Sequence, residues 1–114
     1  GFKLRTTGDQ YRDFIHIKML NETLFHFLNN SGLSGIYNFG SGNSIRIKEV
    51  AKIIQSEFEK IYSITPEIFH GKEKLNETIF SYNIDKLRKT FPFNELVSPE
   101  YIVKELLFYC KNNL

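Results

Sequence analysis

Apolar residues recur at helical spacing along two long segments of the chain. In residues 17–30 the apolar positions are Ile17, Leu20, Leu24, Phe27 and Leu28, and a turn cluster of asparagine, serine and glycine follows. In residues 47–62 the apolar positions are Ile47, Val50, Ala51, Ile54 and Phe58. A period near 3.6 residues places such positions on one side of a helix, which must then be buried. The pattern predicts two amphipathic helices.

Capping residues predict two further helices in the C-terminal third. Ser98 precedes Pro99, and this pair is typical of a helix start, because the serine oxygen accepts from a free amide and proline fits the first helical position. Apolar residues continue at helical spacing at Val103, Leu106, Leu107 and Cys110. Asn83 is a suitable N-cap for a shorter helix over residues 83–91.

Short extended segments alternate with these helices. The candidates are residues 2–5, 10–15, 35–39, 66–69 and 78–82. The first two flank a turn at residues 6–9 and are expected to form a hairpin or two edge segments, and the third leads through a glycine loop into the second helix. The sequence therefore predicts an α/β fold, a small mixed domain with short strands and about four helices. We find no internal repeat or linker, so residues 1–114 are expected to form a single domain.

Composition narrows the class of protein. The chain is 41% hydrophobic, and its 15 Lys+Arg are interspersed among 13 Asp+Glu, so it has no basic stripe for nucleic acid. No apolar run reaches the roughly 18 residues of a membrane span. Its single cysteine, Cys110, cannot form an internal disulfide, so we expect a cytoplasmic protein.

Arg12 is the sharpest candidate for ligand binding. It lies between apolar neighbours in the run 10–17, and a guanidinium offers a planar fork of donors that suits phosphate oxygens. The alternative is an internal ion pair with Asp13 or Glu73. Alternation along a strand would place Phe14 and His16 on the same face as Arg12, where we expect Phe14 in the core and His16 either packed or in contact with ligand.

The glycine loop at residues 40–42 resembles a dinucleotide-binding corner only superficially. The third glycine of that fingerprint would stand at position 45, which is Ile45. We therefore expect no cofactor to bind to this chain, and expect the glycines to allow positive φ angles in a tight corner braced by Asn38. The histidines and Cys110 lack the spacing of metal ligands, and no catalytic nucleophile or acid–base pair is evident.

Two motifs in series resemble one enzyme family. The run Arg12-Asp13-Phe14-Ile15-His16-Ile17 is similar to the Arg-Asp-Phe/Tyr-x-His/Tyr-Val/Ile segment that opens the substrate-binding part of extended short-chain dehydrogenase/reductases acting on nucleotide sugars. The run 37–42 is similar to the Tyr/Phe-Asn-x-Gly-x-Gly segment that follows one helix later. Residues 82–87 and 98–100 resemble two further family segments in the correct order.

The resemblance implies the C-terminal lobe of a Rossmann-type, NAD(P)-dependent nucleotide-sugar epimerase, dehydratase or reductase of polysaccharide biosynthesis. In that family NAD or NADP and the Tyr-x-x-x-Lys pair belong to an upstream Rossmann domain, so this chain alone is expected to be inactive. The resemblance assigns the diphosphate of the nucleotide sugar to Arg12. It is compatible with an isomerase activity and with a homodimeric parent enzyme.

The chain departs from the family pattern at several positions. A second diphosphate-binding arginine is replaced by Glu73, with Lys72 and Lys74 as candidate substitutes. Alignment with the family also brings the backbone around Lys3 and Leu4 near the base. Acidic caps of the first helix are replaced at positions 18 and 19, and the Ser or Thr cap of the second helix is replaced at position 46.

Several alternatives stay open on the sequence alone. The competing class is a stand-alone, non-catalytic ligand-binding or protein-interaction module. Within the enzyme class, the sugar, the base and the choice among epimerisation, dehydration and reduction are undecided, because the residues that decide them lie mostly upstream in the family.

Overall fold

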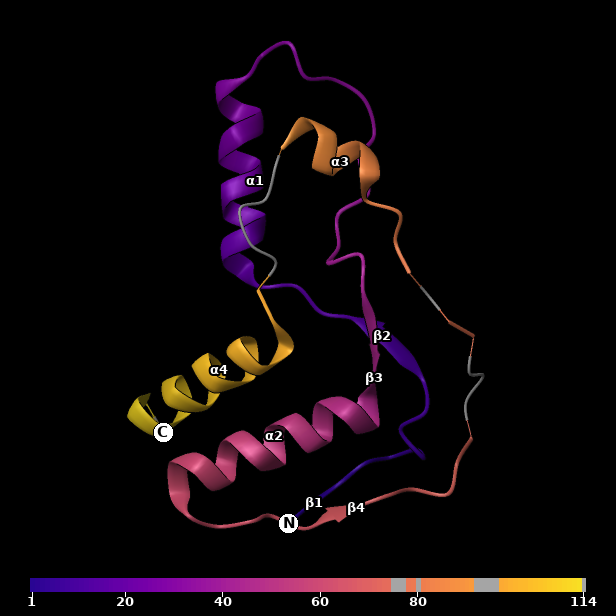
Figure 1. The fold of residues 1–114 in the computed structure, drawn as a ribbon, viewed down its shortest axis with the longest axis vertical. Coiled ribbons are helices and arrows are strands. Elements are labelled where there is room, and N and C mark those ends of the chain that lie inside the picture. Colours follow the sequence, from indigo (N-terminus) through magenta and orange to yellow (C-terminus); the bar gives the residue numbers. More distant parts are fainter. Residues whose placement is uncertain (75–77, 80, 92–96, 114) are drawn as a thin grey trace.

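The computed structural model describes residues 1–74, 78–79, 81–91 and 97–113. The helices are α1 (Ile17–Asn29), α2 (Ile47–Tyr62), α3 (Asp85–Thr90) and α4 (Pro99–Asn113). The strands are β1 (Phe2–Lys3), β2 (Tyr11–Asp13), β3 (Ser44–Arg46) and β4 (Ile68–Phe69). These elements confirm a small mixed α/β fold (Figure 1). None of the helices in the described ranges is long and apolar enough to cross a membrane.

The strands form two separate sheets of two strands each. β1 pairs with β4 in parallel, with Phe2 opposite Ile68. β2 pairs with β3 in antiparallel orientation, with Arg12 opposite Ile45. The two N-terminal strands thus find different partners, so the hairpin alternative is wrong and the alternative of two edge segments holds.

The long helices match the sequence pattern closely. α2 covers residues 47–62 as predicted, and α1 ends one residue before the predicted limit. Other groups replace the missing caps: His16 Nδ1 accepts from the Lys18 amide at 3.1 Å, and the Glu49 carboxylate accepts from the Arg46 amide at 3.0 Å. Ser98 accepts from the Tyr101 amide at 3.2 Å, as expected of the cap of α4.

Two predicted strands are wrong in the part of the chain that the structure describes. Residues 35–39 are irregular, and the strand lies instead at β3, which begins two residues after the glycine loop at residues 40–42. Residues 78, 79, 81 and 82 form no strand, while Phe80 lies outside the described residues. Of the predicted strand at residues 66–69, only β4 forms.

α3 begins two residues after the predicted start at residue 83. Asn83 Oδ1 accepts from the Asp85 amide at 2.9 Å.

The buried core is small and takes residues from all four helices or their caps. The buried apolar residues of the described ranges are Met19, Ala51, Ile84, Leu87 and Val103. α1 buries Met19 and Thr23 but leaves Leu24 and Leu28 52% and 82% exposed, so most of its predicted core face is open. Phe14 is 38% exposed, and its predicted place in the core is wrong.

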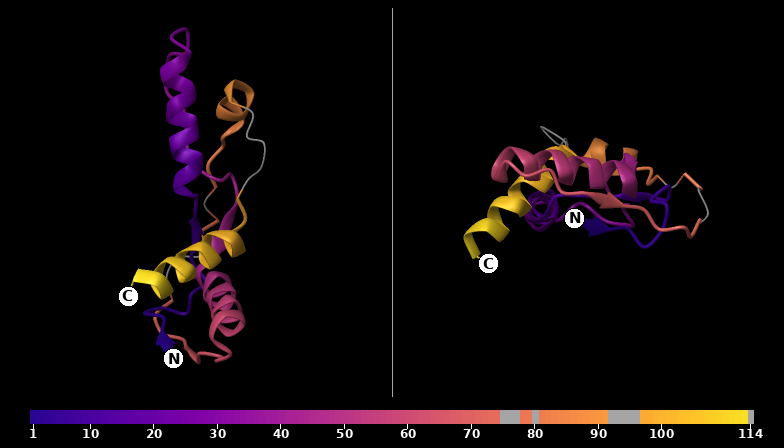
Figure 2. Two further views of the ribbon diagram at one scale, coloured as in Figure 1. Left: turned by 90° about the vertical axis from the view of Figure 1, so that its left-hand side faces the viewer. Right: turned by 90° about the horizontal axis from the view of Figure 1, so that it is seen from below.

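The molecule is flat and elongated. Its extents are 50 × 36 × 20 Å and its radius of gyration is 16.9 Å, against about 13 Å for a compact chain of this length. α1 rises away from the α2 and α4 pair in Figure 1 and in the left-hand view of Figure 2. This shape explains why apolar side chains of α1 remain at the surface.

Candidate functional site

Strand β2, which carries Arg12, is anchored to the beginning of α2. The Ile47 amide donates to the Gln10 carbonyl at 3.1 Å, and the Lys48 amide donates to the Gly8 carbonyl at 2.9 Å. Gly8 has a φ of +82°, a left-handed conformation that glycine adopts without strain. The turn before Arg12 is therefore held by the first two amides of α2.

An ion pair adds to this anchor. Lys48 Nζ lies 2.5 Å from Asp9 Oδ1. The hydrogen bond from Lys48 lowers the pKa of the Asp9 carboxyl below its ordinary value. The negative charge of Asp9 in this turn is thus paired with Lys48 of α2.

A second segment, residues 71–73, lies along residues 5–7. Thr6 and Glu73 form a parallel bridge, the Gly71 amide donates to the Thr6 carbonyl at 3.0 Å, and the Thr7 amide donates to the Glu73 carbonyl at 3.0 Å. A Cβ atom at Gly71 would lie 2.0 Å from the Arg5 carbonyl oxygen. Only glycine permits this approach, so the two segments have a fixed register.

These segments enclose an open pocket of about 500 Å³, which we call the Arg12 pocket. Its lining residues are Leu4, Arg5, Thr6, Gln10, Arg12, Ile47 and Glu73. The two polar, uncharged side chains of the wall bond each other, since the Thr6 hydroxyl donates to Gln10 Oε1 at 3.0 Å. The charged groups of the wall are two guanidinium groups and one carboxylate. A pocket with this balance can bind an anion.

The Arg12 guanidinium is exposed, and its Nη1 donates to the Tyr11 carbonyl at 2.7 Å. Neither acidic partner considered from the sequence pairs with it. Asp13 accepts from the Ser41 amide at 3.0 Å with both oxygens, and Glu73 Oε2 lies 4.0 Å from Arg5 Nε.

The other predicted binding residues occupy different places around the pocket. Leu4 lines it, and Lys3 is exposed on the adjacent strand β1. Lys72 and Lys74 are exposed and do not line it, whereas Glu73 between them does. Arg5 was missed by the sequence reasoning, although its position next to Leu4 was a usable signal.

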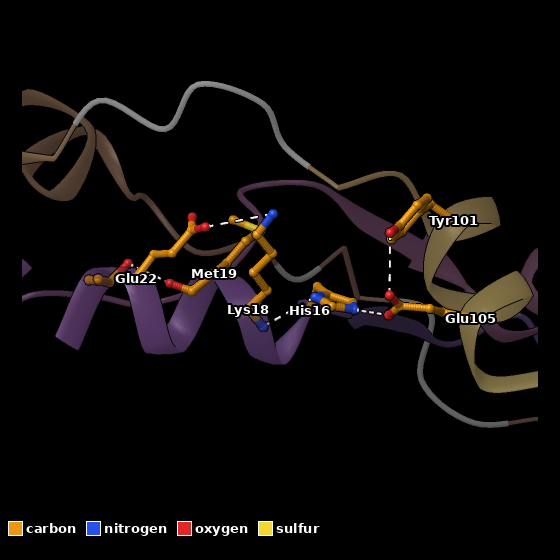
Figure 3. Close-up of polar contacts among 7 residues, drawn as sticks. His16, Lys18, Met19, Glu22, Tyr101 and Glu105 are labelled. Atoms are coloured by element: carbon orange, nitrogen blue, oxygen red, sulfur yellow. Dashed lines mark hydrogen bonds and ion pairs between the residues drawn. The ribbon is translucent and has the colours of Figure 1, made fainter. Parts of the chain in front are cut away.

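His16 lies elsewhere, at the junction of α1 and α4. It lines a mostly apolar hollow of about 550 Å³ together with Ile15, Ile17, Ile102, Glu105, Leu106 and Tyr109. Its side chain is 12% exposed, its Nε2 contacts the Glu105 carboxylate, and its Nδ1 accepts the Lys18 amide (Figure 3). The hydrogen bond with His16 is the main cause that lowers the pKa of the Glu105 carboxyl. His16 thus connects two helices and is separate from the Arg12 pocket.

The glycine loop forms a structural corner. Gly42 has a φ of +76°, as expected. A Cβ atom at Gly40 would lie 2.5 Å from Asp13 Oδ2, so Asp13 packs closely on the loop as well as bonding Ser41. Asn38 donates to the Asn83 carbonyl at 3.1 Å, and so ties the corner to the approach of α3. No group of three or more metal-binding side chains occurs among the residues with described positions.

The fold can be compared with solved structures. No family model matches the chain. It superposes on an NAD-dependent NDP-hexosamine 5,6-dehydratase, TunA, involved in tunicamycin biosynthesis, with a TM-score of 0.80 and 21% identity over 98% of this chain and 36% of that chain. The chain has the fold of the C-terminal region of Rossmann-type nucleotide-sugar enzymes.

Two further structures support this fold. UDP-N-acetylglucosamine 4-epimerase from Methanobrevibacter ruminantium M1, in complex with UDP-N-acetylmuramic acid, gives a TM-score of 0.77 at 19% identity over 98% of this chain and 35% of that one. UDP-N-acetylglucosamine 4-epimerase from Bacillus cereus gives 0.75 at 22% identity over 96% and 37%. The chain therefore spans about a third of the length of the structures it matches, and the fold expected from the two sequence motifs is confirmed.

Proposed function

We propose that this chain is the nucleotide-sugar-binding portion of an NAD(P)-dependent epimerase, dehydratase or reductase, in which Arg12 binds the diphosphate. The observation that carries the proposal is the Arg12 guanidinium on a pocket wall, with no acidic side chain at ion-pair distance in the ranges that the structure describes. A planar guanidinium can donate to two phosphate oxygens at once and stays charged at physiological pH.

The rest of the pocket suits the remainder of a nucleotide. Leu4 and Ile47 provide apolar wall, and the backbone of Lys3 and Leu4 lies beside it, where we place the base. Lys72 and Lys74 lie on the segment that carries Glu73 and add positive charge near the pocket without lining it.

The nicotinamide cofactor is assigned to the upstream part of the parent enzyme. The glycine loop of this chain does not fit a cofactor phosphate, because the Ser41 amide already donates to both oxygens of Asp13 and a second anion there would face a fixed carboxylate. NAD or NADP would exchange hydride with the sugar, while this chain holds and orients the nucleotide. We therefore propose that the isolated chain is inactive.

The exposed face of α1 gives the upstream part a place to dock. Leu24, Phe25 and Leu28 are 52%, 69% and 82% exposed on this one helix. Exposed apolar surface of this kind marks an interaction site. We assign it to the Rossmann-type part of the parent enzyme, since this chain covers only 36% of the dehydratase structure on which it superposes. A stand-alone module, the competing reading, would leave this surface in water.

Calorimetric titration of the full-length protein with UDP-, dTDP-, CDP- and GDP-sugars tests the proposal. We expect nucleotide sugars with one of these four bases to bind. Arg12→Ala should weaken that binding by more than about tenfold, which corresponds to the loss of one charge-assisted contact. Nicotinamide binding should stay unchanged. Arg88→Ala, which removes an exposed arginine of α3 outside the pocket, is the matched control. Equal affinity of Arg12→Ala and wild type would remove Arg12 from the site.

A further inference from the structure

The Arg12 pocket contains a second guanidinium that the sequence motifs did not indicate. Arg5 lines the same pocket as Arg12, and its Nε lies 4.0 Å from Glu73 Oε2. The side chains of Arg5 and Glu73 are 93% and 55% exposed. Both therefore reach the solvent side of the pocket, where a ligand would enter.

The backbone holds these two residues on neighbouring segments. The parallel bridge between Thr6 and Glu73 sets the register, and the Thr7 amide bonds the Glu73 carbonyl at 3.0 Å. The close approach of Gly71 to the Arg5 carbonyl prevents the segments from sliding. Arg5 and Glu73 thus start from fixed positions on neighbouring segments.

The contact with Glu73 also constrains which nitrogens of Arg5 remain available. Glu73 is nearest to Nε, and a guanidinium carries its remaining donors on the two Nη atoms. A carboxylate near Nε leaves the Nη donors for another acceptor. An ion pair this exposed is weak in water, so a ligand anion can engage Arg5 with little opposition from Glu73.

The charge balance of the pocket favours a second cation. A nucleotide diphosphate ester carries two negative charges, and Glu73 would cancel the charge of Arg12 if Arg12 were alone. Arg5 makes the pocket net positive. We infer that Arg5 is the second phosphate-binding residue, an inference that rests on the proposed function of the Arg12 pocket.

The test uses the full-length protein and compares UDP, dTDP, CDP and GDP with the matching nucleosides by calorimetry. We expect Arg5→Gln to weaken binding of the preferred diphosphate by about tenfold and to leave the nucleoside affinity unchanged. Arg88→Gln is the control for loss of an exposed arginine. Because the Arg5 side chain is almost fully exposed, Arg5→Gln should keep the wild-type unfolding temperature.

A charge exchange gives a second, independent readout. Arg5→Glu alone should abolish measurable diphosphate binding, and the double variant Arg5→Glu with Glu73→Arg should restore most of it, because two guanidinium groups and one carboxylate again line the pocket. Wild-type affinity in Arg5→Gln, or no recovery in the double variant, would overturn the assignment of Arg5. If Arg12→Ala also binds like wild type, the proposed function itself fails; if only Arg5→Gln does, that function stands with Arg12 as its cation.

Discussion

His16 and Glu105 join the first residues of α1 to the middle of α4. His16 Nε2 contacts the Glu105 carboxylate, and Tyr101 donates its hydroxyl to the same carboxylate at 3.3 Å. Because His16 Nδ1 accepts from the Lys18 amide at 3.1 Å, the proton of the neutral ring must be on Nε2, where it is donated to Glu105. One imidazole therefore caps α1 and bonds it to α4 (Figure 3).

Replacement of His16 should separate these two effects. His16→Ala loses both the cap and the link to α4, and we expect it to lower the free energy of unfolding by about 1–3 kcal/mol. His16→Asn keeps a capping oxygen next to Lys18 but is too short to bond Glu105, so it should recover part of that loss. Urea denaturation measures both variants, and equal stability of His16→Ala and wild type would contradict the double role.

Asp9 should make stability depend on pH in a defined direction. Its pKa is lowered from 3.8 mainly by the hydrogen bond with Lys48. A folded-state pKa below the unfolded value stabilises the protein above the unfolded value, and this stabilisation is lost as the pH falls through the folded value. Asp9→Asn should therefore be less stable than wild type at neutral pH, with a difference that shrinks in acid below pH 3.8. Denaturation at a series of pH values checks this, and a difference that grows in acid would refute it.

Gly40 should not tolerate a side chain. A Cβ atom there would lie 2.5 Å from Asp13 Oδ2 and 3.0 Å from Tyr82 Cδ2, so Gly40→Ala must displace the carboxylate that bonds Ser41. We expect a loss of about 1–3 kcal/mol. Gly32→Ala is the matched control, because a Cβ atom at Gly32 has no neighbour within 4 Å among the described residues, and should change stability by less than about 0.5 kcal/mol. Thermal denaturation of both variants decides the comparison.

The exposed face of α1 should be buried in the full-length protein. If the Phe25 ring packs on the upstream part, Phe25→Ser should lower the free energy of unfolding of the full-length protein by about 2–4 kcal/mol. Ile64→Ser is the control, since Ile64 is 61% exposed and follows the end of α2 instead of belonging to α1. Chemical denaturation gives both values. A loss in Phe25→Ser no larger than in Ile64→Ser would show that α1 does not carry the docking surface.

The helices could be predicted from the sequence because their hydrogen bonds are local. The apolar period of residues 47–62 and the Ser98–Pro99 start record contacts between positions three or four apart. The two motifs at residues 12–17 and 37–42 also indicated the fold of a C-terminal lobe, because they occur in the same order as in the family they resemble. The helix caps were harder to predict. The usual capping residues are missing, and His16 and Glu49 instead accept hydrogen bonds from amides at the two helix starts.

Strand pairing and the composition of the pocket were decided only by the tertiary structure. Phe2 pairs with Ile68, and Thr6 with Glu73, across separations that no local pattern encodes. Because side chains alternate along an extended segment, the pairing of Glu73 with Thr6 brings Glu73 into the pocket lining and leaves Lys72 and Lys74 out of it. The sequence by itself determined where helices form and that Arg12 lies on a strand, while long-range register decided which charges share its pocket.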